Sequence, residues 1–132
     1  MLRIATGTAL VLTAAAGQAA AHHSFDAEFD RNRTITVTGT VVKLEWTNPH
    51  ARIYVDGTDE NGKTQTWDFE LGPPNGLMRR GWNRHSLRPG HKVTVSGFRS
   101  KTSDVIANAR TVKLADGREV FAGSSFDTGP VQ

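Results

Sequence analysis

Three histidines are the residues of this sequence best suited to binding a metal ion. His22 and His23 follow an alanine-rich N-terminal stretch, and His50 follows Asn48-Pro49. A cut after Ala21 would let His22 offer both its free amine and its imidazole to one ion, and His50 supplies a third nitrogen if the arm folds across its loop. Three nitrogens in a T-shaped or tetragonal arrangement suit Cu(II) better than a closed tetrahedral zinc site. The sequence therefore predicts copper at His22, His23 and His50.

Two further interpretations of these histidines stay open. A cut after Ala20 would place His23 third in an Ala-His-His terminus, which also suits copper or nickel in a square-planar site. Without any metal, the terminal pair is tolerated at a flexible end and His50 only hydrogen-bonds its own loop. His85 and His91 stand among Asn, Arg and Gly, and we expect them to be solvated.

Aromatic, amide and cationic residues suggest a second kind of site. Trp46, Asn48, Tyr54 and Trp67 could form a platform for a sugar or another small ligand, although tryptophans such as Trp46 and Trp67 are more often part of a core. Arg79 and Arg80 lie near the end of a predicted short helix, where cations interact favourably with the helix dipole. The predicted ligand-binding residues are Trp46, Asn48, Tyr54, Arg79 and Arg80. The alternative for the two arginines is a solvated helix face.

Catalytic motifs are missing from the sequence. Glu45, Asp68 and Glu70 could act as acid and base, but their alternating positions on strands fit an outer face. There is no nucleophile motif, phosphate loop or dinucleotide fingerprint. We therefore expect no enzyme, since a copper-dependent oxidase would also need an open coordination position and a substrate surface. A small ligand, a metal ion or an envelope protein is the expected partner.

The first 21 of the 132 residues have the layout of a secretory signal peptide, with Arg3, an apolar run and small residues at Ala19 and Ala21. That run is too short to span a bilayer. We predict cleavage after Ala21, with cleavage after Ala19 as the main alternative. The mature chain is then periplasmic or secreted and has no membrane span.

Charge and cysteine content narrow the function further. The formal net charge is +3 and the charges alternate in sign, which indicates a solvated surface rather than one that binds nucleic acid. The chain has no cysteine, so its hydrophobic core must stabilise the fold without disulfides, even in an oxidising compartment.

The stretch 35–56 contains two strands, and the first of them must bend. Its apolar residues fall on odd positions up to Val41 and on even positions from Val42. A straight strand cannot bury both sets on one face, so we predict a bulge or coil near Val41 and Val42, with Gly39 giving backbone freedom just before it.

The second and third strands are expected to form a hairpin, and the pattern of apolar residues predicts its register. A two-residue turn at Asn61-Gly62 would set an apolar face against a polar one. A three-residue loop centred on Asn61, with Gly62 in the left-handed conformation, avoids this conflict. It pairs Val55 with Trp67, Ile53 with Phe69, and Ala51 with Leu71.

The remaining segments complete a small all-β fold. We predict a helix from Asn75 as its cap to Trp82, a fourth strand at 93–96, and a fifth at 106–114 with a short partner at 118–121. Residues 22–33 form either a helical turn or an extended arm. This order predicts a five-stranded OB-like barrel with a short helix between strands 3 and 4, a jelly roll or open sandwich being the alternative. The domain spans 22–124 and a flexible tail follows at 125–132.

Several short blocks occur along the chain in a fixed order. They read AHHSF at 21–25, EWTNPH at 45–50, FELG at 69–72, RRGW at 79–82 and FAGS at 121–124. In these blocks the chain resembles a family of small exported bacterial proteins of unknown function. The resemblance implies export but no activity, ligand or catalytic residue. Arg52 departs from the family pattern, in which an aromatic or apolar residue is common.

Overall fold

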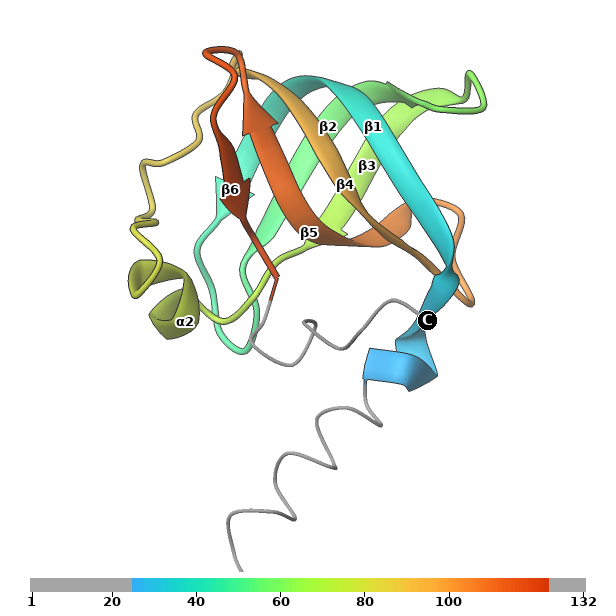
Figure 1. Ribbon diagram of the computed structural model, residues 1–132, viewed down its shortest axis with the longest axis horizontal. Coiled ribbons are helices and arrows are strands. Elements are labelled where there is room, and N and C mark those ends of the chain that lie inside the picture. Colours follow the sequence, from blue (N-terminus) through green and yellow to red (C-terminus); the bar gives the residue numbers. More distant parts are fainter. Residues whose placement is uncertain (1–24, 124–132) are drawn as a thin grey trace, which may run out of the picture.

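The computed structural model describes residues 25–123, and most of these residues lie in strands (Figure 1). The elements in chain order are β1 (Phe29–Glu45), β2 (Arg52–Asp59), β3 (Thr64–Glu70), α2 (Pro74–Met78), β4 (Lys92–Ser100), β5 (Ile106–Leu114) and β6 (Glu119–Phe121). The predicted all-β class is confirmed. The predicted signal peptide at 1–21 and the predicted tail at 125–132 lie outside the described residues.

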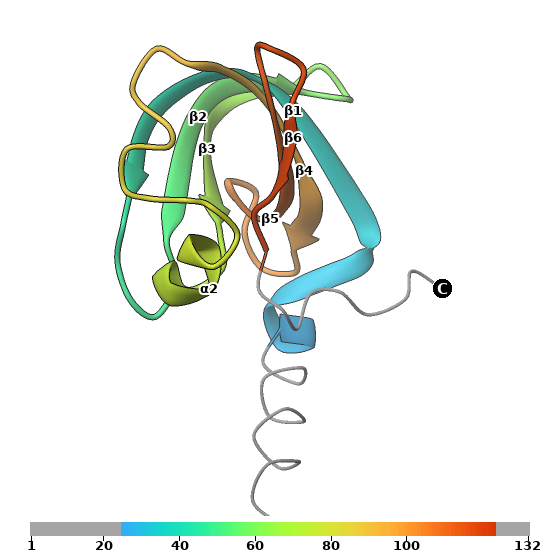
Figure 2. The ribbon, with the colours of Figure 1, turned by 60° about the vertical axis from the view of Figure 1, so that its left-hand side comes forward.

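The six strands form one sheet in the order β3-β2-β1-β4-β5-β6. A parallel pairing also joins β3 to β5, with Asp68 opposite Ile106 and Glu70 opposite Asn108. Strand β3 therefore has β2 on one side and β5 on the other. Figure 2 shows the resulting curl of the sheet, with α2 below the ends of β2 and β3.

Strand β1 serves both halves of the sheet because it bends. It pairs with β2 and with β4, and its register against β2 shifts between Val41 and Lys43. The predicted bulge is confirmed, and Val42 is the extra residue. A second shift lies between Asp30 and Thr34, where β1 pairs with β4.

The β2–β3 hairpin has the predicted register. Val55 lies opposite Trp67 and Ile53 opposite Phe69, and the Leu71 amide donates to the Ala51 carbonyl over 2.8 Å. Gly62 has a φ of +85°, as the three-residue loop requires.

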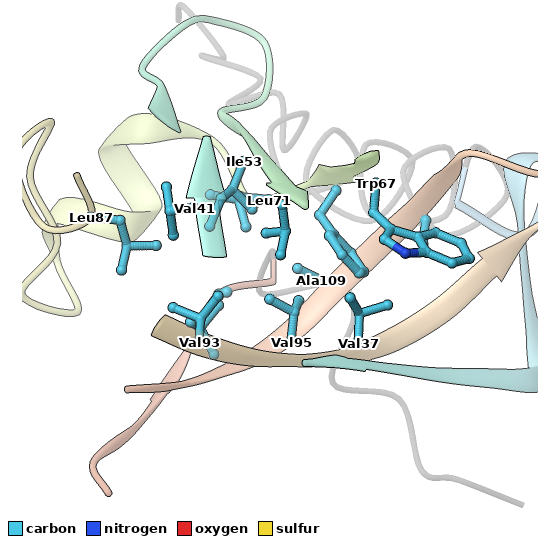
Figure 3. Packing of buried hydrophobic residues seen from close by; sticks show 14 of the residues in the cluster. Val37, Val41, Ile53, Trp67, Leu71, Leu87, Val93, Val95 and Ala109 are labelled. Carbon is cyan, nitrogen blue, oxygen red and sulfur yellow. The ribbon is translucent and has the colours of Figure 1, made fainter. Parts of the chain in front are cut away.

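The main core fills the inside of the curled sheet. Figure 3 shows Val37, Val93 and Val95 on one side facing Ile53, Leu71 and Trp67 on the other. Trp67 is 1% exposed, and its indole N–H donates to the Gly57 carbonyl over 3.1 Å. Burying each of these large side chains contributes about 1.5–3 kcal/mol, which makes this cluster the main source of stability.

Helix α2 is shorter than predicted. The cap position is Pro73 and makes no side-chain hydrogen bond, so the predicted Asn75 cap is wrong. The helix ends at Met78 rather than at Trp82, because a turn with Gly81 at φ +92° follows it. Trp82 instead contacts the end of β6, where its indole N–H donates to the Phe121 carbonyl over 3.0 Å.

A second, smaller apolar cluster holds the start of the described chain. Residues 25–28 are helical and β1 follows directly, so each of the two predicted alternatives for 22–33 holds for part of the segment. The Phe25 ring lies 5.3 Å from the Phe29 ring and 6.0 Å from the Phe98 ring, between centroids. Ile106 of β5 packs against this cluster.

Candidate functional site

Polar side chains gather on the outer face of β1, β2 and β3, near the loop that carries His50. The pairing places Arg52 between Glu45 and Glu70, and Tyr54 between Lys43 and Asp68. We call the following residues the outer-face cluster: Lys43, Glu45, His50, Arg52, Tyr54, Asp68 and Glu70. Apart from Lys43, its members are half-buried.

Arg52 links the two carboxylates of β3. Its Nε lies 2.8 Å from Asp68 Oδ1, and its Nη1 lies 3.5 Å from Glu70 Oε2. The hydrogen bond to Asp68 raises the pKa of the Arg52 guanidinium, against the opposing effect of burial. Arg52 is therefore a fixed positive charge that orients both carboxylates.

Glu45 is held ionised at the edge of the cluster. Its carboxylate accepts a hydrogen bond from Lys43 Nζ over 2.7 Å and one from the Tyr54 hydroxyl over 3.3 Å. The Lys43 hydrogen bond lowers the pKa of the Glu45 carboxyl, with burial acting in the opposite sense. Such a carboxylate is poorly suited to donate a proton near neutral pH.

His50 lies where the loop returns to β2, after the cis Asn48–Pro49 peptide. Its Nδ1 is 3.1 Å from Glu70 Oε1, and its side chain is 39% exposed against 16% for Glu70. When the neutral ring donates from Nδ1 to Glu70, Nε2 is left with its lone pair. This carboxylate–histidine contact is the arrangement that orients metal-ligating histidines in proteins.

The other predicted site residues do not lie together in the part of the chain that the structure describes. His22 and His23 lie outside the described residues. Within residues 25–123 there is no group of three His, Cys, Asp or Glu side chains placed to hold a metal ion. Trp46 packs against the main core, Asn48 is exposed, and Tyr54 belongs to the outer-face cluster, so these three are in different surroundings.

Arg79 and Arg80 are exposed residues that follow α2 (Figure 1), and neither belongs to the outer-face cluster. The Arg80 guanidinium lies 4.0 Å above the Phe121 ring centroid and lines a hollow beside β6, whereas Arg79 is not among the residues that line it.

Sequence reasoning missed the links between Arg52, Asp68 and Glu70. It assigned the two acids to an outer face but gave Arg52 no partner. The signal was present, because the predicted hairpin register already sets Arg52 opposite Glu70. Opposite charges on facing positions of paired strands stabilise a sheet, and they also indicate a cluster.

The sequence comparisons identify a family but no activity. A sequence model of a family of unknown function, DUF6152, matches residues 9–108. The chain belongs to this family. The DUF6152 match ends at Asn108, which is the last residue of the β3–β5 pairing. No curated protein and no solved structure matches the chain. Within residues 25–123 of this DUF6152 protein, no helix is long and apolar enough to cross a membrane.

Proposed function

We propose that this chain is an exported, non-enzymatic binding domain that holds one Cu(II) ion through His50 and the N-terminal histidines His22 and His23. The observation that carries the proposal is the contact between His50 Nδ1 and Glu70 Oε1 at 3.1 Å. It leaves Nε2 of a 39% exposed side chain directed away from its carboxylate partner and able to bind an ion.

The strand arrangement supports an OB-like barrel as the frame for this site. In such barrels strands 3 and 5 meet, and here β3 pairs with β5 while α2 lies between β3 and β4. The loop between strands 1 and 2 borders the usual binding face of that fold. His50 stands at the end of the corresponding loop, which joins β1 to β2.

The position of Phe25 supports the approach of the terminal histidines. Phe25 is fixed against Phe29 and Phe98, and His22 precedes it by only three residues, which span about 10 Å at most when extended. Figures 1 and 2 both show the helical residues 25–28 and the β1–β2 loop at the same end of the sheet. Cleavage after Ala21 would add the amine of His22 to this end.

A structural or envelope-interaction module without a metal is the second candidate. The ion pair between Arg52 and Glu70 favours this candidate. A Glu70 carboxylate held by both Arg52 and His50 stabilises the sheet even when no metal ion is bound. A copper-dependent oxidase is a third class, and turnover of copper-loaded protein with a reductant would reveal it.

Copper titration of the mature chain tests the proposal. Mass spectrometry of the exported protein should show His22 as the first residue, and calorimetry should show one Cu(II) bound per chain. His50→Ala should weaken binding at least about tenfold through the loss of one ligand. Binding should also weaken below the ordinary histidine pKa of about 6.5, because coordinating nitrogens must be deprotonated.

Two matched variants make the titration specific. Adding Gly-Gly-Gly ahead of His22 separates the terminal amine from the His22 imidazole. It also leaves no histidine at the second or third position of the new N-terminus, where a histidine could bind copper together with the amine. Copper binding should therefore weaken. His85→Ala changes an exposed histidine and should leave the affinity as in the unmodified protein. If the extended chain and the His50 variant both bind copper normally, the site does not exist and the structural module is the better interpretation.

A further inference from the structure

The alternation of charge expected from the sequence does not hold along the whole chain. From residue 71 to residue 103 there is no acidic residue, whereas that stretch contains seven Lys or Arg residues. It includes α2, the loop that follows, and β4. The side of the molecule around α2 and the loop is therefore cationic, in contrast to the mixed charges of the outer-face cluster.

A hollow of about 200 Å³ lies on this cationic side, between the loop after α2 and the β5–β6 hairpin. The apolar residues that line it are Trp82, Leu87, Leu114 and Val120, and the charged residues are Arg80 and Arg118. No acidic residue lines it. A second hollow of about 270 Å³ shares Leu114 and Arg118 with the first and adds Lys92, although Asp116 lines it too.

The two arginines of the first hollow differ in how they are held. Arg80 stacks on Phe121 at 4.0 Å and makes no ion pair with any residue in 25–123, so its charge is not neutralised there. Arg118 uses Nε to bond Asp116 Oδ2 over 2.7 Å, which leaves its two Nη groups for another acceptor. Two guanidinium groups beside one apolar wall favour a ligand with an anionic head and an apolar body.

We propose that this hollow binds a small organic carboxylate with an apolar tail. The carboxylate lies between Arg80 and Arg118, and the tail packs against Leu87, Leu114 and Val120. The ligand must be small, because 200 Å³ is below the range of about 300–1,000 Å³ for drug-sized ligands. A bare phosphate or a polyanion would leave the apolar wall unused, and a neutral alkyl chain would leave the arginines unused. The site involves none of the residues proposed for copper.

The proposal is tested by titrating the full mature chain with octanoate, octanol and inorganic phosphate. Binding is followed by calorimetry and by the amide resonances of Gly81, Ser86 and Val120. Octanoate should bind at the hollow and shift these resonances more than either control compound. Equal binding of octanol or of phosphate, or shifts located elsewhere, would contradict the proposal, as would no binding of octanoate.

Charge-neutral variants identify the head-group contacts. Arg80→Gln and Arg118→Gln should each weaken octanoate binding about tenfold, since each removes a charge-assisted hydrogen bond. Arg79→Gln is the matched control, because Arg79 is an exposed neighbour that does not line the hollow. Two results would overturn the assignment. One is a loss of octanoate affinity in the Arg79 variant equal to that in the Arg80 variant. The other is a loss below about twofold in both the Arg80 and the Arg118 variants.

Discussion

Asp59 shows how one buried carboxylate can hold a turn and a neighbouring strand together. Its side chain is 2% exposed, and it accepts hydrogen bonds from the amides of Asn61 and Lys63 and from Arg99 Nη2. Burial would raise the pKa of Asp59, but the hydrogen bonds from Lys63, Arg99 and Asn61 outweigh it and lower the pKa below the ordinary 3.8. The ionised group therefore stabilises the fold above that ordinary value, and the stabilisation is lost as the pH falls through the lower folded-state pKa.

Asp59→Asn should lower the free energy of unfolding at pH 7, because the Arg99 guanidinium loses its buried carboxylate partner. The difference from the unmodified protein should shrink as the pH falls through the lowered pKa of Asp59, because the unmodified carboxyl then also becomes protonated. Urea denaturation at several pH values measures both effects. Asp104→Asn is the control, since that exposed carboxylate has no hydrogen bond or ion pair within residues 25–123. A difference that stays constant with pH would contradict the role given to Asp59.

Residue types alone did not reveal the contacts that surround His50 and Arg80 in the structure. The sequence pointed to His50 because histidine is a common ligand, and it could not supply Glu70 as its partner, since that contact depends on how the loop returns to the sheet. Arg118 was missed for a similar reason: it lies 38 residues beyond Arg80, and only the β5–β6 hairpin brings the two to one hollow.

At the scale of strands, two glycines differ in why they are needed. Gly97 lies at the register shift between β4 and β5, and a Cβ atom there would be 1.7 Å from the Asn108 carbonyl oxygen. Gly62 has open space around it and needs only its positive φ of +85°. The first glycine allows two backbones to approach, and the second allows a turn.

Gly97→Ala should therefore destabilise the protein by about 3 kcal/mol, because backbone must move. Gly62→Ala should cost only about 1–2 kcal/mol, the ordinary price of left-handed backbone for a residue with a Cβ. Gly76→Ala is the control, since its Cβ would meet only Pro73 at 3.9 Å. Thermal and chemical denaturation rank the three variants. A Gly97 variant as stable as the Gly62 variant would show that the strands separate easily at this point.

The strands were more predictable than the helix. The β2–β3 register and the bulge at Val42 followed from the alternation of apolar residues, since a shift by one residue would turn the buried set to solvent. The cap of α2 did not follow from a comparable pattern. Asn75 is a good cap by type, but Pro73 and Pro74 already start the helix with a suitable backbone angle.

At the scale of the whole fold, residues 25–123 contain two apolar clusters of unequal size. The main core includes Phe69, which is fully buried, while Phe25 belongs to the small cluster with Phe98. The sequence left a helical turn and an extended arm as alternatives for this segment, and the partners of Phe25 and Phe29 come from β4 and β5, which the local pattern does not reveal. The amide of Lys101 also donates to the Glu28 carbonyl over 2.9 Å, which ties this first segment to the end of β4.

Phe25→Ala should release this segment without unfolding the sheet. Hydrogen exchange should become faster at the Lys101 amide, while the amides of β2 and β3 keep their protection. Phe69→Ala, in contrast, should cost about 3–5 kcal/mol and speed exchange throughout. Loss of protection throughout the sheet of the Phe25 variant would show that the two clusters form a single cooperative unit.

The pairing of β3 with β5 also determines when this chain can fold. Val37 must find Val95 and Asp68 must find Ile106, so most of the sequence has to be present before the sheet can close. Contacts between such distant residues require long loops to be closed first, which places folding on a scale of milliseconds to seconds rather than microseconds. A chain that stops before Ile106 leaves β3 with an unpaired edge. Under the export proposed above, slow closure would keep the polypeptide extended during its passage through a secretion channel, and the sheet would close once β5 had arrived to pair with β3.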